Sequence, residues 1–270
     1  MTTATSFTGR WRKLANISAD SKGSIHDDEA AQKLGFRGAF VPGSVVGTAA
    51  LEGAFEQFGS RFLDRGWYDL TFVSPVYEQD DVRATAESVD GDDLAVRVED
   101  ASGRLCCSGR TGLDGAVPWR YEDDGTHGAE GVLPGLELGT EFAGSTFSVI
   151  PRDIEPLLTG AGEASEWYTL KSPWGGPVVP PERLQRIALD VSRTKRLEIG
   201  GVREPGMWAG HALVMRAPLF LGRVYSMSER VVDKGRSGRA VFLTYEFRVT
   251  NGAGDEVAVG RHKVKWLAAE

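Results

Sequence analysis

One histidine and the polar residues around it are the strongest candidates for chemistry in this 270-residue sequence. His26 follows a short segment that contains Asp20 and Ser21, and an acidic run at 27–29 comes directly after it. An imidazole and a carboxylate that share one water molecule can take a proton from that water and deliver it to carbon. This pairing favours acid–base chemistry on a bound water molecule. The alternative is that His26 only caps or packs the loop before a helix.

A glycine further along the chain could supply the second requirement of such a reaction. Gly43 opens a segment, 44–58, whose apolar residues recur at helical spacing. The free N–H groups at the start of a helix stabilise negative charge, including charge that develops on oxygen during a reaction. We therefore predict that Gly43 donates its N–H to a reacting carbonyl oxygen.

These residues belong to a unit that occurs twice in the chain. Segment 35–43 is similar to 173–181, and segment 70–77 is similar to 213–220, in the same order. Each first segment leads into a helical pattern, at 44–58 and 182–196. Each second segment is followed by alternating strands, predicted at 81–89, 94–99 and 105–111 in the first half and at 224–232, 240–250 and 256–266 in the second.

The repeat predicts an α+β fold built from two similar domains. A helix with an apolar stripe must bury it, and the antiparallel sheet that follows is the available partner. We place the domains at 1–115 and 136–270. The segment between them, 116–135, is rich in Gly, Asp, Glu and Pro, and we interpret it as a linker.

The first half resembles the MaoC-like (R)-specific enoyl-CoA hydratases. In that family a histidine loop precedes a short helix and a Gly-containing turn into the hotdog helix. The matching residues here are Ile25, His26, Asp28, Ala30, Ala31, Gly35, Phe36 and Gly43. The resemblance implies a double hotdog fold. It also implies that His26 and a carboxylate hold the catalytic water while Gly43 contacts the thioester oxygen. Ser21 stands at the family's Asp position, and Asp20 lies one residue earlier.

The second half has different residues at the corresponding positions. Glu163 replaces the Asp and Tyr168 replaces the His, while Trp174 lies in a turn that resembles the non-catalytic halves of double-hotdog proteins. Tyrosine is a poor base near neutral pH because its pKa is about 10. The first half is therefore expected to be catalytic. Ser21, Glu163, Tyr168 and Trp174 are expected to contact substrate, although Glu163 and Tyr168 could instead form a different acid–base pair.

The family resemblance implies a lyase that hydrates an enoyl thioester or dehydrates a 3-hydroxyacyl thioester. The expected substrate is an acyl-CoA or an acyl-carrier-protein thioester, and no cofactor or metal is expected. Two alternatives remain open. One is a double hotdog enzyme that performs elimination or isomerisation on a bulky, polyketide-like substrate. The other is a non-catalytic partner subunit.

Composition narrows the setting of the protein. A net charge of −7 disfavours binding to nucleic acid or anionic lipid, and no long apolar run or signal peptide is evident. Adjacent Cys106 and Cys107 predict free thiols, so we expect a cytoplasmic protein. Hotdog units pair at sheet edges, which predicts a homodimer. The other histidines are expected to be structural: His127 solvated, His211 at the edge of the core, and His262 facing solvent.

Overall fold

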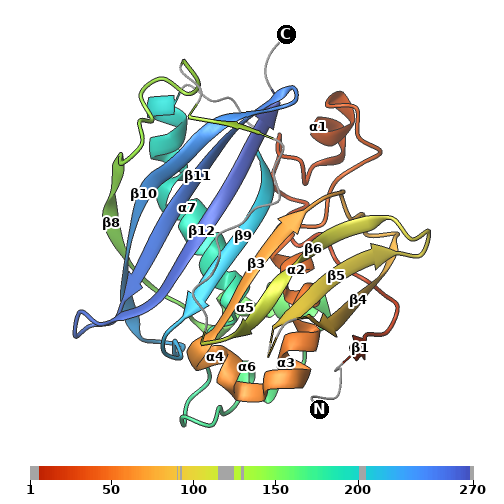
Figure 1. The fold of residues 1–270 in the computed structure, drawn as a ribbon, viewed down its shortest axis with the longest axis vertical. Helices are drawn as coiled ribbons and strands as arrows, with labels where there is room; N and C mark the ends of the chain where they lie inside the picture. Colours follow the sequence, from red (N-terminus) through yellow and green to blue (C-terminus); the bar gives the residue numbers. More distant parts are fainter. Residues whose placement is uncertain are drawn as a thin grey trace.

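The computed structural model describes residues 6–89, 91, 93–114, 125–128, 131–200 and 205–267. One large antiparallel sheet curves around the helices (Figure 1). In spatial order its strands are β1 (Ser6–Thr8), β4 (Asp81–Ser88), β5 (Leu94–Asp100), β6 (Leu105–Leu113), β3 (Gly66–Phe72), β9 (Met207–Met215), β12 (Glu256–Leu267), β11 (Ala240–Thr250), β10 (Val224–Ser237) and β7 (Thr126–His127). β2 (Arg12–Lys13) pairs with β4, and β8 (Glu141–Ser148) pairs with β10.

The centre of the sheet has the two-fold symmetry that the sequence repeat requires. β3 and β9 are antiparallel neighbours, in which Tyr68 lies opposite Leu213 and Leu70 lies opposite His211. The repeat equates Leu70 with Leu213 and therefore Tyr68 with His211. Tyr68 therefore lies opposite the equivalent of Leu70, and Leu70 lies opposite the equivalent of Tyr68. The Asp69–Ala212 pair lies midway between these two pairs. The local axis relating the halves passes through this pair.

Backbone hydrogen bonds repeat in the two halves at the residues that the sequence alignment equates. Val41 N–H donates to the Val76 carbonyl at 2.8 Å, and Val179 N–H donates to the Leu219 carbonyl at 2.7 Å. Both bonds tie the turn before a central helix to the end of a central strand. The two turns are therefore held in the same way, and the sequence match between them reflects the same local structure.

A second pair of repeated bonds fixes the loop that carries His26. Phe40 N–H donates to the Ile25 carbonyl at 3.0 Å, and in the other half Val178 N–H donates to the Trp167 carbonyl at 2.9 Å. The residue after each of these carbonyls is His26 in the first half and Tyr168 in the second. These two side chains stand at equivalent points of the fold.

Helices α2 (Gly43–Ala50) and α7 (Pro181–Gly200) lie on the concave side of the sheet (Figure 1). One apolar cluster joins both halves and includes buried residues of both helices, such as Val45 and Leu184. The single helix predicted over 44–58 is interrupted at Leu51, where ψ is −1° and the chain turns into α3 (Glu52–Phe58). The remaining helices are α1 (Asp28–Lys33), α4 (Phe62–Arg65), α5 (Pro151–Ala161) and α6 (Glu166–Thr169), with a 3-10 turn at Gly59–Arg61.

The predicted domain limits enclose the two sets of elements. β1 to β6 fall within 1–115 and β8 to β12 within 136–270, while the two-residue strand β7 lies inside the predicted linker. Residues 115–124 and 129–130 lie outside the described part of the chain, so the limits stay a prediction. Among the described helices, none is long and apolar enough to span a bilayer.

Candidate functional site

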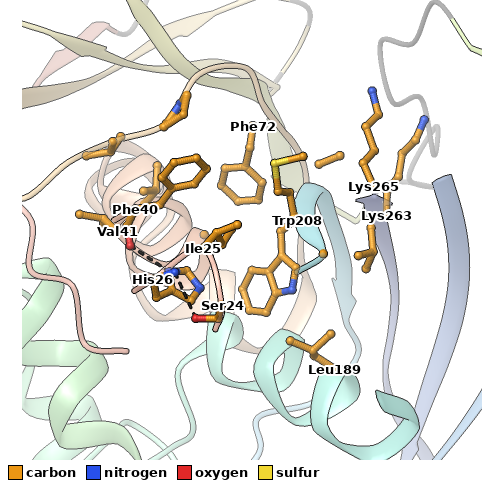
Figure 2. Close-up of a pocket in the computed structure, with 18 of the residues that line it drawn as sticks. Ser24, Ile25, His26, Phe40, Val41, Phe72, Leu189, Trp208, Lys263 and Lys265 are labelled. Atoms are coloured by element: carbon orange, nitrogen blue, oxygen red, sulfur yellow. Dashed lines mark hydrogen bonds between the residues drawn. The ribbon is translucent and has the colours of Figure 1, made fainter. Parts of the chain in front are cut away.

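A cavity of about 380 Å³ lies between the two halves, and His26 and Gly43 are both in its wall. The first half contributes the loop around His26, the start of α2 and the end of β3. The second half contributes α7, the start of β9 and the end of β12. Figure 2 shows His26, Phe72 and Trp208 around this space, with Lys263 and Lys265 extending away from the imidazole. The wall combines apolar and aromatic side chains with polar and charged ones, as ligand sites do.

The His26 imidazole is held in one orientation. Its Nδ1–H donates to the Phe40 carbonyl at 2.9 Å, and its backbone N–H donates to Ser24 Oγ at 3.1 Å. Burial lowers the pKa of His26; the bond to Phe40 acts in the opposite direction, and the charge of Arg186 lowers it further. The imidazole is therefore neutral near pH 7. Because Nδ1 carries the proton, Nε2 has a lone pair available to accept one.

Gly43 begins α2 at the cavity wall. The first hydrogen bond at this end of the helix runs from Val45 N–H to the Pro42 carbonyl, so the N–H of Gly43 precedes the intrahelical series. A Cβ atom at this position would lie 2.8 Å from the Trp208 ring and 3.2 Å from the Phe72 ring. The close approach of these two aromatic side chains explains why glycine is needed here.

Asp20 and Ser21, the two candidates for positioning water, differ in location. Ser21 is part of the cavity wall, whereas Asp20 is exposed and is not among the lining residues. The structure therefore places Ser21, and not the Asp20 carboxylate predicted to pair with His26, in the cavity wall. The loop between Ser21 and His26 turns tightly, with Ser24 N–H bonded to the Ser21 carbonyl at 3.1 Å.

Glu163, Tyr168 and Trp174 do not line the cavity, which corrects the expectation that they contact substrate there. Tyr168 is buried, with its ring edge against Phe55 at 6.3 Å. Burial raises the pKa of Tyr168 well above its usual value, and the charge of Glu163 raises it further. Glu163 accepts a hydrogen bond from Ser165 N–H at 2.7 Å, and Trp174 packs against the core. In the second half, the aromatic side chains of Tyr168 and Trp174 therefore pack at the positions that correspond to the His26 loop and the turn before α2.

The polar lining residues on α7 were not singled out from the sequence. Arg186 and Asp190 lie in the wall and form an ion pair at 3.3 Å. The wall also includes Trp208 of β9, which faces the start of α2. The i,i+4 spacing of Arg186 and Asp190 was the only available signal, and it is common on exposed helix faces. Two histidine predictions are wrong: His262 and His211 are both 0% exposed, so neither faces solvent or lies at the edge of the core.

The remaining titratable residues do not form a metal centre in the described ranges, where no group of three or more His, Cys, Asp or Glu side chains is arranged to hold an ion. Cys106 and Cys107 are buried free thiols. Burial raises the pKa of Cys106 to about 11, so it is not a thiolate near neutral pH.

Comparison with solved structures decides the fold. A protein described as a MaoC domain dehydratase from Chloroflexus aurantiacus superimposes with a TM-score of 0.67 over 100% of this chain and 97% of that one, at 12% identity. A hypothetical protein of Mycobacterium tuberculosis described as having a double hotdog fold gives a TM-score of 0.66 over 98% and 97%, also at 12% identity. This chain is a double hotdog.

Another structural match has a different described activity. A protein described as an oleoyl thioesterase from Lactobacillus plantarum gives a TM-score of 0.52 over 100% of this chain and 99% of that one, at 8% identity. No protein-family model and no curated protein matches the sequence. At these identities the likeness supports the fold, and the activity must be argued from the residues of the site.

Proposed function

We propose that this double hotdog is a hydratase or dehydratase that acts on the 2,3 bond of an acyl thioester. The observation that carries the proposal is the neutral His26 imidazole in the wall of the same cavity as the first N–H of α2. The likeness to MaoC-like dehydratases supports the same class of reaction. The substrate is an acyl-CoA or acyl-carrier-protein thioester.

In the hydration direction, His26 acts first as a base. Nε2 takes a proton from water as the water oxygen forms a bond to C3 of the enoyl thioester, and the electron pair of the double bond moves toward C2 and the thioester oxygen. The imidazolium then returns a proton to C2, which restores neutral His26 and gives the 3-hydroxyacyl thioester. Ser21 lies in the same wall and positions the water through its hydroxyl group. Dehydration follows the reverse path.

The thioester oxygen gains negative charge during this reaction. The N–H of Gly43, at the positive end of α2, donates to that oxygen. Trp208 and Phe72 pack against Gly43 and keep water away from this donor, which strengthens the interaction. Arg186 of α7 lies in the cavity wall beside its ion-pair partner Asp190.

The proposal is tested with purified protein and short and medium 2-enoyl-CoA substrates, following the ultraviolet absorbance of the conjugated thioester. We expect His26→Gln to lower kcat by about 10²- to 10⁴-fold, the usual contribution of a general acid–base residue. His127→Gln is the matched control, because His127 is exposed, pairs with Asp233 and is not among the residues that line the cavity. It should leave kcat unchanged.

Two results would count against the proposal. Full activity of His26→Gln would remove the assigned base. Release of free CoA without loss of the double bond would instead identify a thioesterase, an activity described for one of the structural matches. A thiol reagent in the same assay separates the two reactions.

A further inference from the structure

A second histidine–carboxylate pair lies in the core of the second half. Glu182 on α7 accepts a hydrogen bond from His211 on β9, with Nδ1 and Oε2 2.8 Å apart. The two side chains are 1% and 0% exposed. We call this pair the Glu182–His211 dyad. In form it is a base oriented by a carboxylate, as found in many sites that handle protons.

The dyad keeps unused hydrogen-bonding capacity. Among the described residues, no group forms a hydrogen bond with His211 Nε2, Glu182 Oε1 or the nearby Gln185 Oε1, and all three atoms are buried. Leaving such a buried polar atom without a partner is unfavourable, because its hydrogen bonds to water are lost and not replaced. A core chosen for stability alone would avoid these atoms, so their presence points to a ligand group that completes them.

The equivalent positions of the first half lack this chemistry. The repeat aligns Ser44 with Glu182 and Tyr68 with His211. Tyr68 instead accepts a hydrogen bond from Gln185 at 3.3 Å. The space for the Glu182 carboxylate comes from Gly47 of α2, where a Cβ atom would lie 2.6 Å from Glu182 Cδ. The dyad is therefore particular to the second half and depends on a glycine from the first.

Two aromatic side chains separate the dyad from the cavity that contains His26. Trp208 and Phe72 line the cavity, and their rings lie 4.5 Å and 4.8 Å from the His211 ring. Trp208 also contacts the buried His262 ring at 4.7 Å. In Figure 2 the Trp208 indole lies to the right of the His26 imidazole, and the Phe72 ring lies above it. A ligand that reaches the dyad from this cavity must displace these two side chains.

We propose that the Glu182–His211 dyad is the deep end of the acyl-binding site and selects a thioester whose acyl chain carries a hydroxyl group. The proposal rests on the proposed function for the thioester at the mouth and adds the substrate class. With Nδ1–H donated to Glu182, Nε2 accepts a hydrogen bond from the hydroxyl. The hydroxyl oxygen can in turn accept a hydrogen bond from a neighbouring donor. A purely apolar chain would leave these buried atoms without partners.

The test uses pairs of 2-enoyl-CoA substrates that differ by one hydroxyl group at successive positions from C5 onward. Wild-type protein should prefer one hydroxylated member by tenfold or more in kcat/KM, because a site built for a polar group rejects the analogue that lacks it. His211→Leu should abolish this preference, so that the two members of the preferred pair are turned over with equal kcat/KM. Glu182→Gln keeps the side-chain volume and should reduce the preference for the hydroxylated substrate. This variant provides the test if His211→Leu does not fold.

The matched control is His127→Leu, which makes the same substitution at an exposed histidine outside the cavity wall and should leave the preference intact. Equal kcat/KM for both members of every pair in wild type would overturn the inference, as would equal losses on both members in His211→Leu. Calorimetric binding of the unreactive thioether analogues of the same pairs separates this inference from the proposed function. Absence of turnover with every enoyl-CoA would contradict the proposed hydratase function. A binding preference for the hydroxylated analogue that depends on His211 would still support hydroxyl binding at the dyad.

Discussion

The two halves place different residues at the same points of one architecture. The loop before the central helix presents His26 in the first half and Tyr168 in the second, each fixed by the same backbone bond. The helix then begins with Gly43 in one half and Pro181 in the other. Proline has no N–H, so the start of α7 cannot donate to an oxyanion at that residue. The second half has both a weaker base and no equivalent donor, although its fold is intact.

The difference at the helix start gives the largest expected effect. Gly43→Pro would give the first half the residue of the second, and should lower kcat/KM by about 10²- to 10³-fold through loss of one oxyanion donor. Gly43→Ala is the control, since it adds a Cβ near Trp208 but keeps the N–H. Steady-state kinetics of both variants decide the point. Equal losses would attribute the effect to crowding by the side chain.

The difference between imidazole and phenol should appear in the pH dependence. Burial lowers the pKa of His26 from 6.5, and the base must be neutral to act. We therefore expect kcat/KM to be constant near neutral pH and to fall about tenfold per pH unit below that lowered pKa. The profile should be the same in Tyr168→Phe. An acidic limb that moves in this variant would show that the second half takes part in proton transfer.

Tyr168 should matter for stability rather than for catalysis. Its ring is buried against Phe55, so Tyr168→Ala should reduce the free energy of unfolding by about 3–5 kcal/mol, the usual cost of deleting a buried aromatic side chain. Tyr168→Phe keeps the ring and should cost much less. Urea denaturation of both variants measures the difference. A loss of kcat in Tyr168→Phe with unchanged stability would contradict this assignment.

The smallest effects concern the loop before His26. Ser21→Ala should lower kcat about 2- to 10-fold, corresponding to one neutral hydrogen bond of 0.5–1.5 kcal/mol. Asp20→Asn should leave kcat within twofold, because this side chain is exposed outside the cavity wall. The reverse order of effects would restore the carboxylate as the group that positions water.

Local patterns and the internal repeat were sufficient to predict the architecture. The predicted strands correspond to β4, β5, β6, β10, β11 and β12 with small shifts, except that β10 extends to Ser237. The equivalence of His26 and Tyr168 was also predictable, because it depends on short segments with the same turn. Alternation along strands and turn residues is encoded within a few positions, so the sequence alone carries it.

The cavity depends on contacts between distant segments and could not be predicted in this way. Trp208 contacts Gly43 only because the fold places the first residues of β9 against the start of α2, far away in the sequence. His262 lies between two basic residues, which suggested an exposed strand. The register of β12 shifts between Lys263 and Val264, and its neighbours β9 and β11 place the imidazole in the core. Which face of a strand is buried is decided by the other elements that cover it.

The pairing of β3 with β9 also makes the halves inseparable. Hydrogen bonds run across the middle of the sheet from Trp67–Val214 to Thr71–Gly210, and the apolar cluster continues beneath them. A backbone cleavage between the two halves would thus yield fragments that remain associated as one particle. Heating should unfold both halves in a single transition. A substitution that destabilises the half without His26 would therefore also unfold the half that contains it.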